Sequence, residues 1–220
     1  MNVSLMMRRE VGWLAFAALA VVSLPLACIF GGDHEKTRSA PAETTTTATA
    51  APQRAFVRTC GMSIYGRPDA PAWRKHSIRA GPLTFYYADQ FAQSAGSEFD
   101  AVPGRSGYYA GKTLLILVRR GAVATVVVPE SERRYVALLY NPAEWNDRNE
   151  YRMEDGVSRV TFKACQKGET GPAGGPLNAM TQFNGSFLVT AVRCVPLDVR
   201  VQGEEQALPV RLSFGAGRCV

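Results

Sequence analysis

Histidine is almost absent from this chain, which has 2 histidines among its 220 residues. His34 precedes the folded part, which leaves His76 as the one histidine within it, and no cysteine lies close enough to it for a four-ligand zinc site. The sequence also lacks a Gly-x-Ser-x-Gly elbow, a phosphate loop ending in Lys-Ser/Thr and the acidic loop of a calcium-binding EF-hand. We therefore predict neither a cofactor nor a metal ion.

Apolar side chains other than alanine are missing from one long stretch. Residues 31–55 contain no valine, isoleucine, leucine or aromatic residue and are rich in Thr, Ala and Pro. Such a segment cannot bury enough apolar surface to offset its chain entropy, so we predict a disordered linker there. Residues 56–220 are then left as one extracytoplasmic domain of ordinary size.

The segment before this linker is its opposite in composition. Residues 11–30 are uncharged and almost wholly apolar, and a helix of this length is about long enough to cross a bilayer core. Arg8 and Arg9 precede the run, which predicts a single-pass signal-anchor helix with residues 1–10 in the cytoplasm. Two alternatives stay open: a cleaved signal peptide would make the protein secreted, and lipidation of Cys28 would make it a lipoprotein.

The remaining cysteines form an even set in the predicted domain, at Cys60, Cys165, Cys194 and Cys219. An even number of cysteines outside the membrane argues for two disulfides, for which three connectivities are possible. We predict Cys165–Cys194, which would join two strand-like segments, and Cys60–Cys219, which would tie the two ends of the domain together.

Helical periodicity is weak, around residues 88–95 and 142–151, whereas strand-like patterns recur along the domain. Short apolar or alternating runs separated by turn residues predict an antiparallel β-sandwich, with a partly open β-barrel as the alternative. Residues 187–201 are long enough for two strands broken near Pro196. The expected strands cover residues 83–87, 112–118, 123–128, 134–140, 156–165, 187–201 and 208–214.

One short motif points to an enzyme. The run Thr161-Phe-Lys-Ala-Cys165, at the end of an expected strand, resembles the Thr-Leu-x-Thr-Cys signature of sortases. Sortases are membrane-anchored extracellular β-barrel transpeptidases that use Cys, His and Arg. The resemblance implies Cys165 as the nucleophile, His76 as its base or acid, and Arg193 or Arg200 as the oxyanion stabiliser. The competing interpretation of Cys165 is one half of a structural disulfide.

Aromatic residues beside polar groups are the best binding candidates. Trp145, Tyr108, Phe183 and Asn184 lie in segments that mix rings with hydrogen-bonding side chains, a combination that suits a glycan or a peptide. The competing interpretation is core packing for the rings of Phe85 and Phe187 in the same aromatic segments, and turn formation at Asn184-Gly185. The nearby acidic residues are predicted to form a solvated face: Glu144, Asp147, Glu150, Glu154 and Asp155.

The charge is modestly basic, with 25 Lys and Arg against 19 Asp and Glu, and the arginines are scattered, so we predict no nucleic-acid partner. The combination of anchor, linker and arginine-rich β domain resembles uncharacterised membrane-anchored extracytoplasmic proteins of high-GC Gram-positive bacteria. We expect a non-catalytic cell-envelope module, tethered to the membrane by residues 11–30, that binds a cell-wall polymer or an envelope protein. The alternative is a divergent sortase-like transpeptidase or another envelope enzyme.

Overall fold

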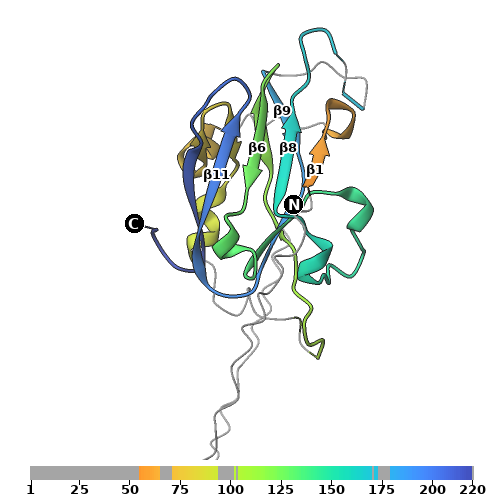
Figure 1. Cartoon of the computed structure of the whole chain (residues 1–220), viewed down its shortest axis with the longest axis vertical. Helices are drawn as coiled ribbons and strands as arrows, with labels where there is room; N and C mark the ends of the chain where they lie inside the picture. Colours follow the sequence, from red (N-terminus) through yellow and green to blue (C-terminus); the bar gives the residue numbers. More distant parts are fainter. Residues whose placement is uncertain are drawn as a thin grey trace, which may run out of the picture. The chain divides into compact units, whose positions relative to one another are not determined.

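β-Strands carry most of the regular structure of the domain (Figure 1). The structure is a computed structural model that describes residues 55–64, 71–93, 102, 104–169, 171–172 and 179–219. The predicted membrane segment at 11–30, the linker apart from Ala55, and Cys28 lie outside the described residues. Within the described ranges, the structure contains no helix with the length and apolar character needed to cross a membrane.

Short strands and 3-10 turns alternate along the chain, which confirms a mostly β domain. The segments with weak helical spacing form 3-10 turns rather than α-helices. The strands are β1 (Ala55–Arg58), β2 (Ile78–Ala80), β3 (Leu83–Phe85), β4 (Lys112–Thr113), β5 (Ile116–Arg119), β6 (Val123–Val127), β7 (Val136–Leu139), β8 (Arg159–Lys163), β9 (Met180–Phe183), β10 (Ser186–Val189), β11 (Arg193–Val201) and β12 (Leu208–Phe214). The 3-10 turns are η1 (Cys60–Met62), η2 (Pro71–His76), η3 (Ala88–Gln93), η5 (Glu130–Glu132), η6 (Pro142–Glu144) and η7 (Met153–Asp155).

The described strands form three sheets. A five-stranded sheet has the order β1-β8-β6-β11-β12, a four-stranded sheet β2-β3-β5-β9 and a three-stranded sheet β4-β10-β7. Figure 1 shows β11, β6, β8 and β1 side by side in the largest sheet. Neighbouring strands run antiparallel except β1 and β8, which are parallel. The prediction of antiparallel sheets is therefore confirmed, with one parallel pair at an edge.

Aromatic side chains from all three sheets meet in one core. Phe162 of β8 lies 5.3 Å from Phe183 of β9, and Phe187 of β10 lies 5.5 Å from Phe214 of β12, measured between ring centroids. Tyr140, just after β7, packs edge-on against Phe162 at 5.2 Å. All five side chains are 0–1% exposed. Rings of this size dominate the apolar area that the domain buries, so they hold the sheets together.

The expected strand at residues 112–118 is two strands in different sheets. β4 pairs with β10, whereas β5 pairs with β3 and β9. At the crossing point the amide of Leu114 donates to the carbonyl of Gly185, and the carbonyl of Leu115 accepts from the amide of Tyr86. The apolar run is explained by this crossing, because Leu114 is buried at the change of sheet and residues 116–118 are buried on both faces of β5.

The predicted strand break near Pro196 is wrong. Pro196 lies inside β11, opposite Arg211 of β12, and the break falls before Arg193 instead. On its other side β11 pairs with β6 only from Asp198 onward. Proline removes a ladder donor and is tolerated where a strand has no neighbour on one side. The free edge of β11 at Pro196 provides such a place.

Two disulfides join the four cysteines of the domain, but the pairing that we predicted is wrong. Cys60 is bonded to Cys165 and Cys194 to Cys219, instead of Cys165 to Cys194 and Cys60 to Cys219. The presence of two disulfides is confirmed and indicates an oxidising, extracytoplasmic environment.

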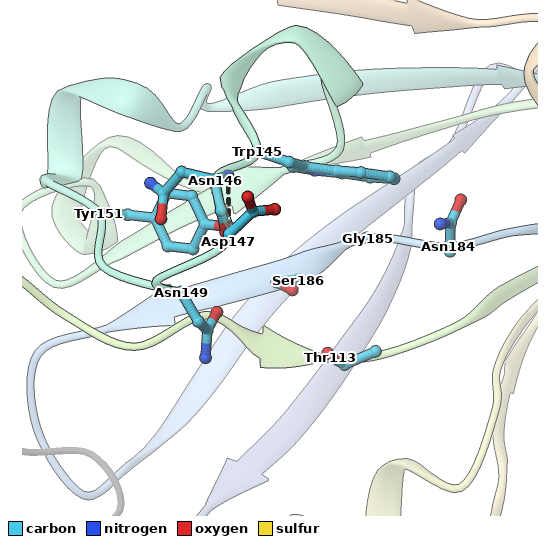
Figure 2. Close-up of a pocket in the computed structure, with 9 residues that line it drawn as sticks. All are labelled: Thr113, Trp145, Asn146, Asp147, Asn149, Tyr151, Asn184, Gly185 and Ser186. Carbon is cyan, nitrogen blue, oxygen red and sulfur yellow. Dashed lines mark hydrogen bonds between the residues drawn. The ribbon is translucent and has the colours of Figure 1, made fainter.

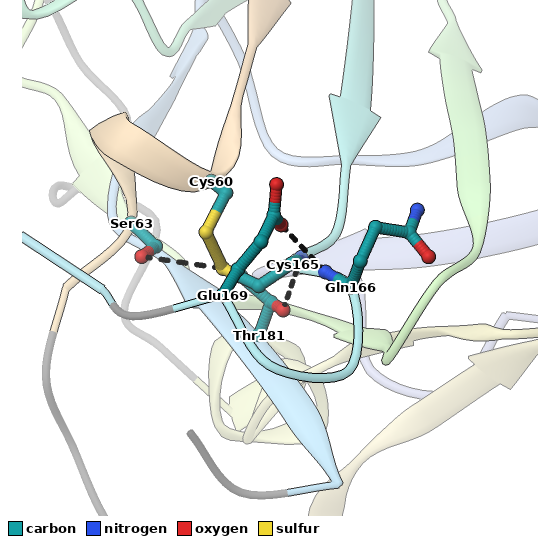
Figure 3. The surroundings of a disulfide bond; sticks show 6 residues. All are labelled: Cys60, Ser63, Cys165, Gln166, Glu169 and Thr181. Carbon is teal, nitrogen blue, oxygen red and sulfur yellow. Dashed lines mark hydrogen bonds between the residues drawn. A yellow bond between two sulfur atoms is a disulfide. The ribbon is translucent and has the colours of Figure 1, made fainter. Parts of the chain in front are cut away.

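The parallel pairing of β1 and β8 explains the first disulfide (Figure 3). Arg58 lies opposite Phe162, and the two strands run in the same direction, so the residues that follow them emerge at the same end of the sheet. Cys60 and Cys165 are those residues. Their bond fixes the edge strand β1 to its neighbour β8 in the largest sheet.

Antiparallel pairing explains the second disulfide. Cys194 near the start of β11 lies opposite Ser213 near the end of β12. The chain that leaves β12 therefore begins beside Cys194, and Cys219 needs only a short turn to reach it. A sequence separation of 25 residues makes this the more local of the two bridges.

Candidate functional site

A polar pocket with one aromatic wall lies beside the loop that follows η6 (Figure 2). Its volume is about 350 Å³. We call it the Trp145 pocket, and it is lined by Thr113, Trp145, Asn146, Asp147, Asn149, Tyr151, Asn184, Gly185 and Ser186. It brings together Trp145 and Asn184, two of the residues that the sequence marked as binding candidates.

The turn η6 places Trp145 at the pocket. β7 ends at Leu139, and the side chain of Asn141 accepts a hydrogen bond of 3.1 Å from the amide of Ala143, which caps the turn. Pro142 occupies the first position of the turn, where its fixed φ is favourable and its missing amide is not needed. The chain then extends again at Trp145, which directs this side chain away from the turn.

The Trp145 ring is held from one side and open on another. Its Nε1 donates to the carbonyl of Leu139 at 3.4 Å, and the guanidinium carbon of Arg58 lies 5.7 Å from the ring centroid. The side chain nevertheless keeps 36% of its surface exposed. An indole that is fixed in place and partly open offers a flat apolar surface to a ligand without losing rotamer entropy on binding.

Side-chain hydrogen bonds fix the polar wall of the pocket. Asn146 bonds Glu150 through both ends of its amide, donating to the carbonyl at 2.8 Å and accepting from the backbone amide at 3.3 Å. Asn149 has a positive φ of 53° and accepts from the amide of Gly111 at 3.2 Å. Asparagine tolerates this left-handed conformation better than most residues. These hydrogen bonds therefore set the shape of this wall.

The link between β9 and β10 forms the opposite wall. The expectation of a turn at Asn184-Gly185 is met only in part, because these residues connect strands of two different sheets rather than a hairpin. A methyl group at Gly185 would overlap the ring of Tyr140. Tyr140 is fixed there because its hydroxyl donates to the carbonyl of Leu114 at 2.6 Å. Glycine is therefore required at position 185 because the Tyr140 ring lies too close for a side chain. The backbone conformation is not the reason, since φ of Gly185 is not positive.

Arg58 lies behind this wall and is 1% exposed. Its Nη1 donates to the carbonyl of Tyr140 at 2.8 Å, and its Nη2 donates to the Oδ1 of Asn184 at 3.0 Å and to the carbonyl of Met62. Burial lowers the pKa of the Arg58 guanidinium, and Tyr140 acts in the opposite direction. Burial likewise raises the pKa of Tyr140, so its hydroxyl stays protonated and remains a donor.

Phe183 is not part of the accessible site, which corrects its prediction as a binding residue. It is 0% exposed, since the alternation along β9 turns Thr181 and Phe183 into the core. Its ring lies 5.8 Å from the guanidinium carbon of Arg58. Phe183 therefore supports the pocket from beneath.

Tyr108, the fourth predicted binding residue, lies in a neighbouring pocket that shares Asn146 and Asp147 with the first. The guanidinium carbons of Arg105 and Arg152 lie 4.6 Å and 4.9 Å from its ring centroid. Hydrogen bonds from Arg152 and then Arg105 lower the pKa of the Tyr108 hydroxyl. Arg105 is also paired with Glu150 at 2.8 Å, so this surface continues the fixed loop of the Trp145 pocket.

The residues of the sortase-like alternative have separate partners. Cys165 is 0% exposed and bonded to Cys60, so in this form it offers no thiolate. His76 pairs with Asp89 at 2.7 Å, and Arg193 pairs with Glu132 at 2.8 Å. No hydrogen bond or ion pair joins Cys165, His76 and Arg193 to one another within the described ranges. The alternative stabiliser Arg200 lies on β11, opposite Thr125 of β6.

Carboxylate and thiol groups do not build a metal centre in the part of the chain that the structure describes. The cluster closest to one is Cys60, Cys165 and Glu169, and its two sulfurs are bonded to each other. A disulfide sulfur lacks the thiolate charge that metal ions need. Glu169 instead accepts from the amide of Gln166 at 2.6 Å, beside the disulfide in Figure 3.

Sequence reasoning missed Arg58 and interpreted Asp147 only as part of a solvated face. Asp147 is exposed, but it also lines the Trp145 pocket. Arg58 carries no local signal, because its burial depends on the pairing of β1 with β8, which lies about a hundred residues away. Together the pocket offers the partly open Trp145 ring, the ring of the buried Tyr151, one carboxylate, several amides and hydroxyls, and a buried cation behind one wall.

No protein-family model matches the chain, and no curated protein is significantly similar to it.

Proposed function

We propose that this protein is a non-catalytic cell-envelope binding module that holds a sugar unit of a cell-wall polymer in the Trp145 pocket. The described domain is proposed to be a β-sandwich outside the cell, tethered to the membrane by residues 11–30. The apolar character of that run and the two disulfides support this placement.

The observation that carries the proposal is the partly open Trp145 ring among fixed polar groups. A pyranose has apolar C–H faces and a rim of hydroxyls, so its binding site needs an aromatic surface together with amides, hydroxyls and a carboxylate. The pocket offers Trp145 for the face and Asp147, Asn149 and Ser186 for the hydroxyls. A peptide partner would instead need a row of backbone donors and acceptors or a larger apolar groove.

The experiment is retention of purified full-length protein on cell-wall polysaccharide, comparing the parent with Trp145→Ala. We expect the variant to bind at least about fivefold more weakly, because stacking on an aromatic ring is commonly worth about 1 kcal/mol or more. Val192→Ala is the matched control, since Val192 is an exposed apolar residue at 44% and lies outside the pocket.

Equal retention of the parent and the Trp145 variant would show that the polysaccharide does not bind in the Trp145 pocket. Retention lost equally in the Val192 control would point to nonspecific apolar adsorption instead. The folded state of each variant is checked by urea denaturation, which should show one cooperative transition for both, at a lower midpoint for Trp145→Ala because that variant loses the hydrogen bond to Leu139 and the contact with Arg58.

A further inference from the structure

The buried charge of Arg58 is not balanced by a carboxylate in the described part of the molecule. All three of its acceptors are neutral oxygens, and its Nε has no hydrogen-bond partner. By contrast, three more exposed arginines each have a carboxylate partner, in the pairs Arg105–Glu150, Arg152–Glu154 and Arg193–Glu132. Arginines buried to this degree are usually paired, because an isolated charge away from water is costly. A counter-charge from outside would relieve that cost.

The Trp145 pocket is where such a counter-charge can approach. Arg58 touches two residues that line it, the Trp145 ring and the Asn184 amide. The attraction between the Arg58 guanidinium and an anion in the pocket would be only weakly screened, because the guanidinium is shielded from solvent. The wall formed by Asn184 is therefore the positive end of the pocket.

Asn184 connects the buried Arg58 guanidinium to the pocket. Its Oδ1 accepts from Nη2 of Arg58 at 3.0 Å, which leaves the two hydrogens of Nδ2 as donors for a ligand. No hydrogen bond engages Nδ2 within the described ranges. An amide polarised by a guanidinium is a stronger donor, and its best acceptor is a charged oxygen.

The other end of the pocket has the opposite character. In Figure 2 the Asp147 carboxylate and the Asn184 amide lie toward opposite ends of the Trp145 ring. Asp147 takes part in no ion pair or hydrogen bond with the described residues. Its carboxylate can accept hydrogen bonds from sugar hydroxyls and repels an anion, in particular a doubly charged phosphate. The pocket therefore has a negative end at Asp147 and a hydrogen-bond-donating, positive end at Asn184.

We propose that the Trp145 pocket selects a sugar with a carboxylate group, bound with the carboxylate at Asn184 and its hydroxyls at Asp147. This inference rests on the proposed function and names its ligand class as an acidic glycan. Arg58 acts in it as a positioning residue that orients and polarises Asn184, without touching the ligand.

The test measures affinity of the full-length protein for matched oligosaccharides, each in a neutral and a carboxylated form, such as galactotriose and trigalacturonate of one linkage. We expect the affinity for each carboxylated member to be at least about tenfold higher than for its neutral partner, as for a hydrogen bond to a charged group. Equal affinity within the pairs would overturn the inference and leave the proposed function standing. Binding to no member of a panel of such pairs would overturn both.

Asn184→Asp separates this mechanism from a merely structural role of the residue. The new carboxylate still accepts from Arg58 and supplies its missing counter-charge, so we expect a higher Tm together with loss of the preference for carboxylated sugars. Asn141→Asp is the matched control, since it adds the same charge outside the pocket and aspartate also caps η6. An equal loss of preference in both variants, or a preserved preference in Asn184→Asp, would contradict the inference.

Discussion

Gly185→Ala should lower the free energy of unfolding by about 4 kcal/mol, from overpacking and a broken buried hydrogen bond. The new methyl group would overlap the ring of Tyr140, which is 1% exposed and packed edge-on against Phe162 and Phe187. The ring can move only by giving up its 2.6 Å hydrogen bond to Leu114. Urea denaturation of parent and variant measures the difference.

The matched control for this prediction is Gly61→Ala. Nothing lies within 4 Å of a Cβ at Gly61, and its φ is not positive, so this variant should keep the stability of the parent within about 0.5 kcal/mol. A second substitution, Tyr140→Leu, should restore part of the loss in Gly185→Ala, because a smaller side chain makes room for the methyl group. Purely additive losses would show that the overlap with Tyr140 is not the cause.

The double variant Cys60→Ala/Cys165→Ala should lose about 5 kcal/mol of stability, and Cys194→Ala/Cys219→Ala about 3.5 kcal/mol, by the loop-closure relation. The first bridge closes a separation of 105 residues and the second one of 25, so the first restricts the unfolded chain more. Unfolding under non-reducing conditions, with each double variant beside the parent, measures both values.

The order of the two disulfide losses is the informative result. A larger loss from the Cys194–Cys219 variant would mean that the native contacts of that bridge outweigh chain entropy. Should either variant fail to fold during production, reduction of the purified parent with a thiol supplies the comparison. Labelling of the freed thiols then shows which bridge has opened at each Tm.

The mostly β character was predictable because strand patterns are local. Alternating or continuously apolar runs identified the regions of β5, β6, β7, β8 and β12 from the chain alone. The strands β1, β2 and β9 were not predicted, since each contains at most two large apolar side chains and so shows neither a continuous apolar run nor a clear alternation. Pro196 misled the prediction because its tolerance depends on a missing neighbour strand, which is a property of the sheet and not of the sequence.

The disulfide pairing could not be predicted for a similar reason. It follows from β1 lying parallel to β8, a contact across about a hundred residues that no local pattern encodes. The candidate site was predictable in its parts but not in its assembly. Trp145 and Asn184 were recognised as binding candidates, whereas Arg58 and the pocket-facing side of Asp147 became visible only once the strands were paired.

Phe183 shows where the interpretation of aromatic residues failed. Its neighbours Asn184 and Gly185 are loop-like, and the ring was assigned to the same exposed segment. Phe183 is the last residue of β9, however, and its period-two alternation directs it into the core. The next residue, Asn184, points the other way and lines the pocket. This explains why Phe183 is buried while the adjacent Asn184 is accessible to a ligand.

The indole N–H resonance of Trp145 reports directly on whether a cell-wall glycan occupies the Trp145 pocket. The resonance is assigned by its loss in Trp145→Phe, and the labelled full-length protein is titrated with solubilised cell-wall polysaccharide fragments. We expect a saturable shift of this resonance, with the other indole resonances unchanged and with the same midpoint as retention on the polysaccharide. Retention that leaves the Trp145 resonance unmoved would contradict the account.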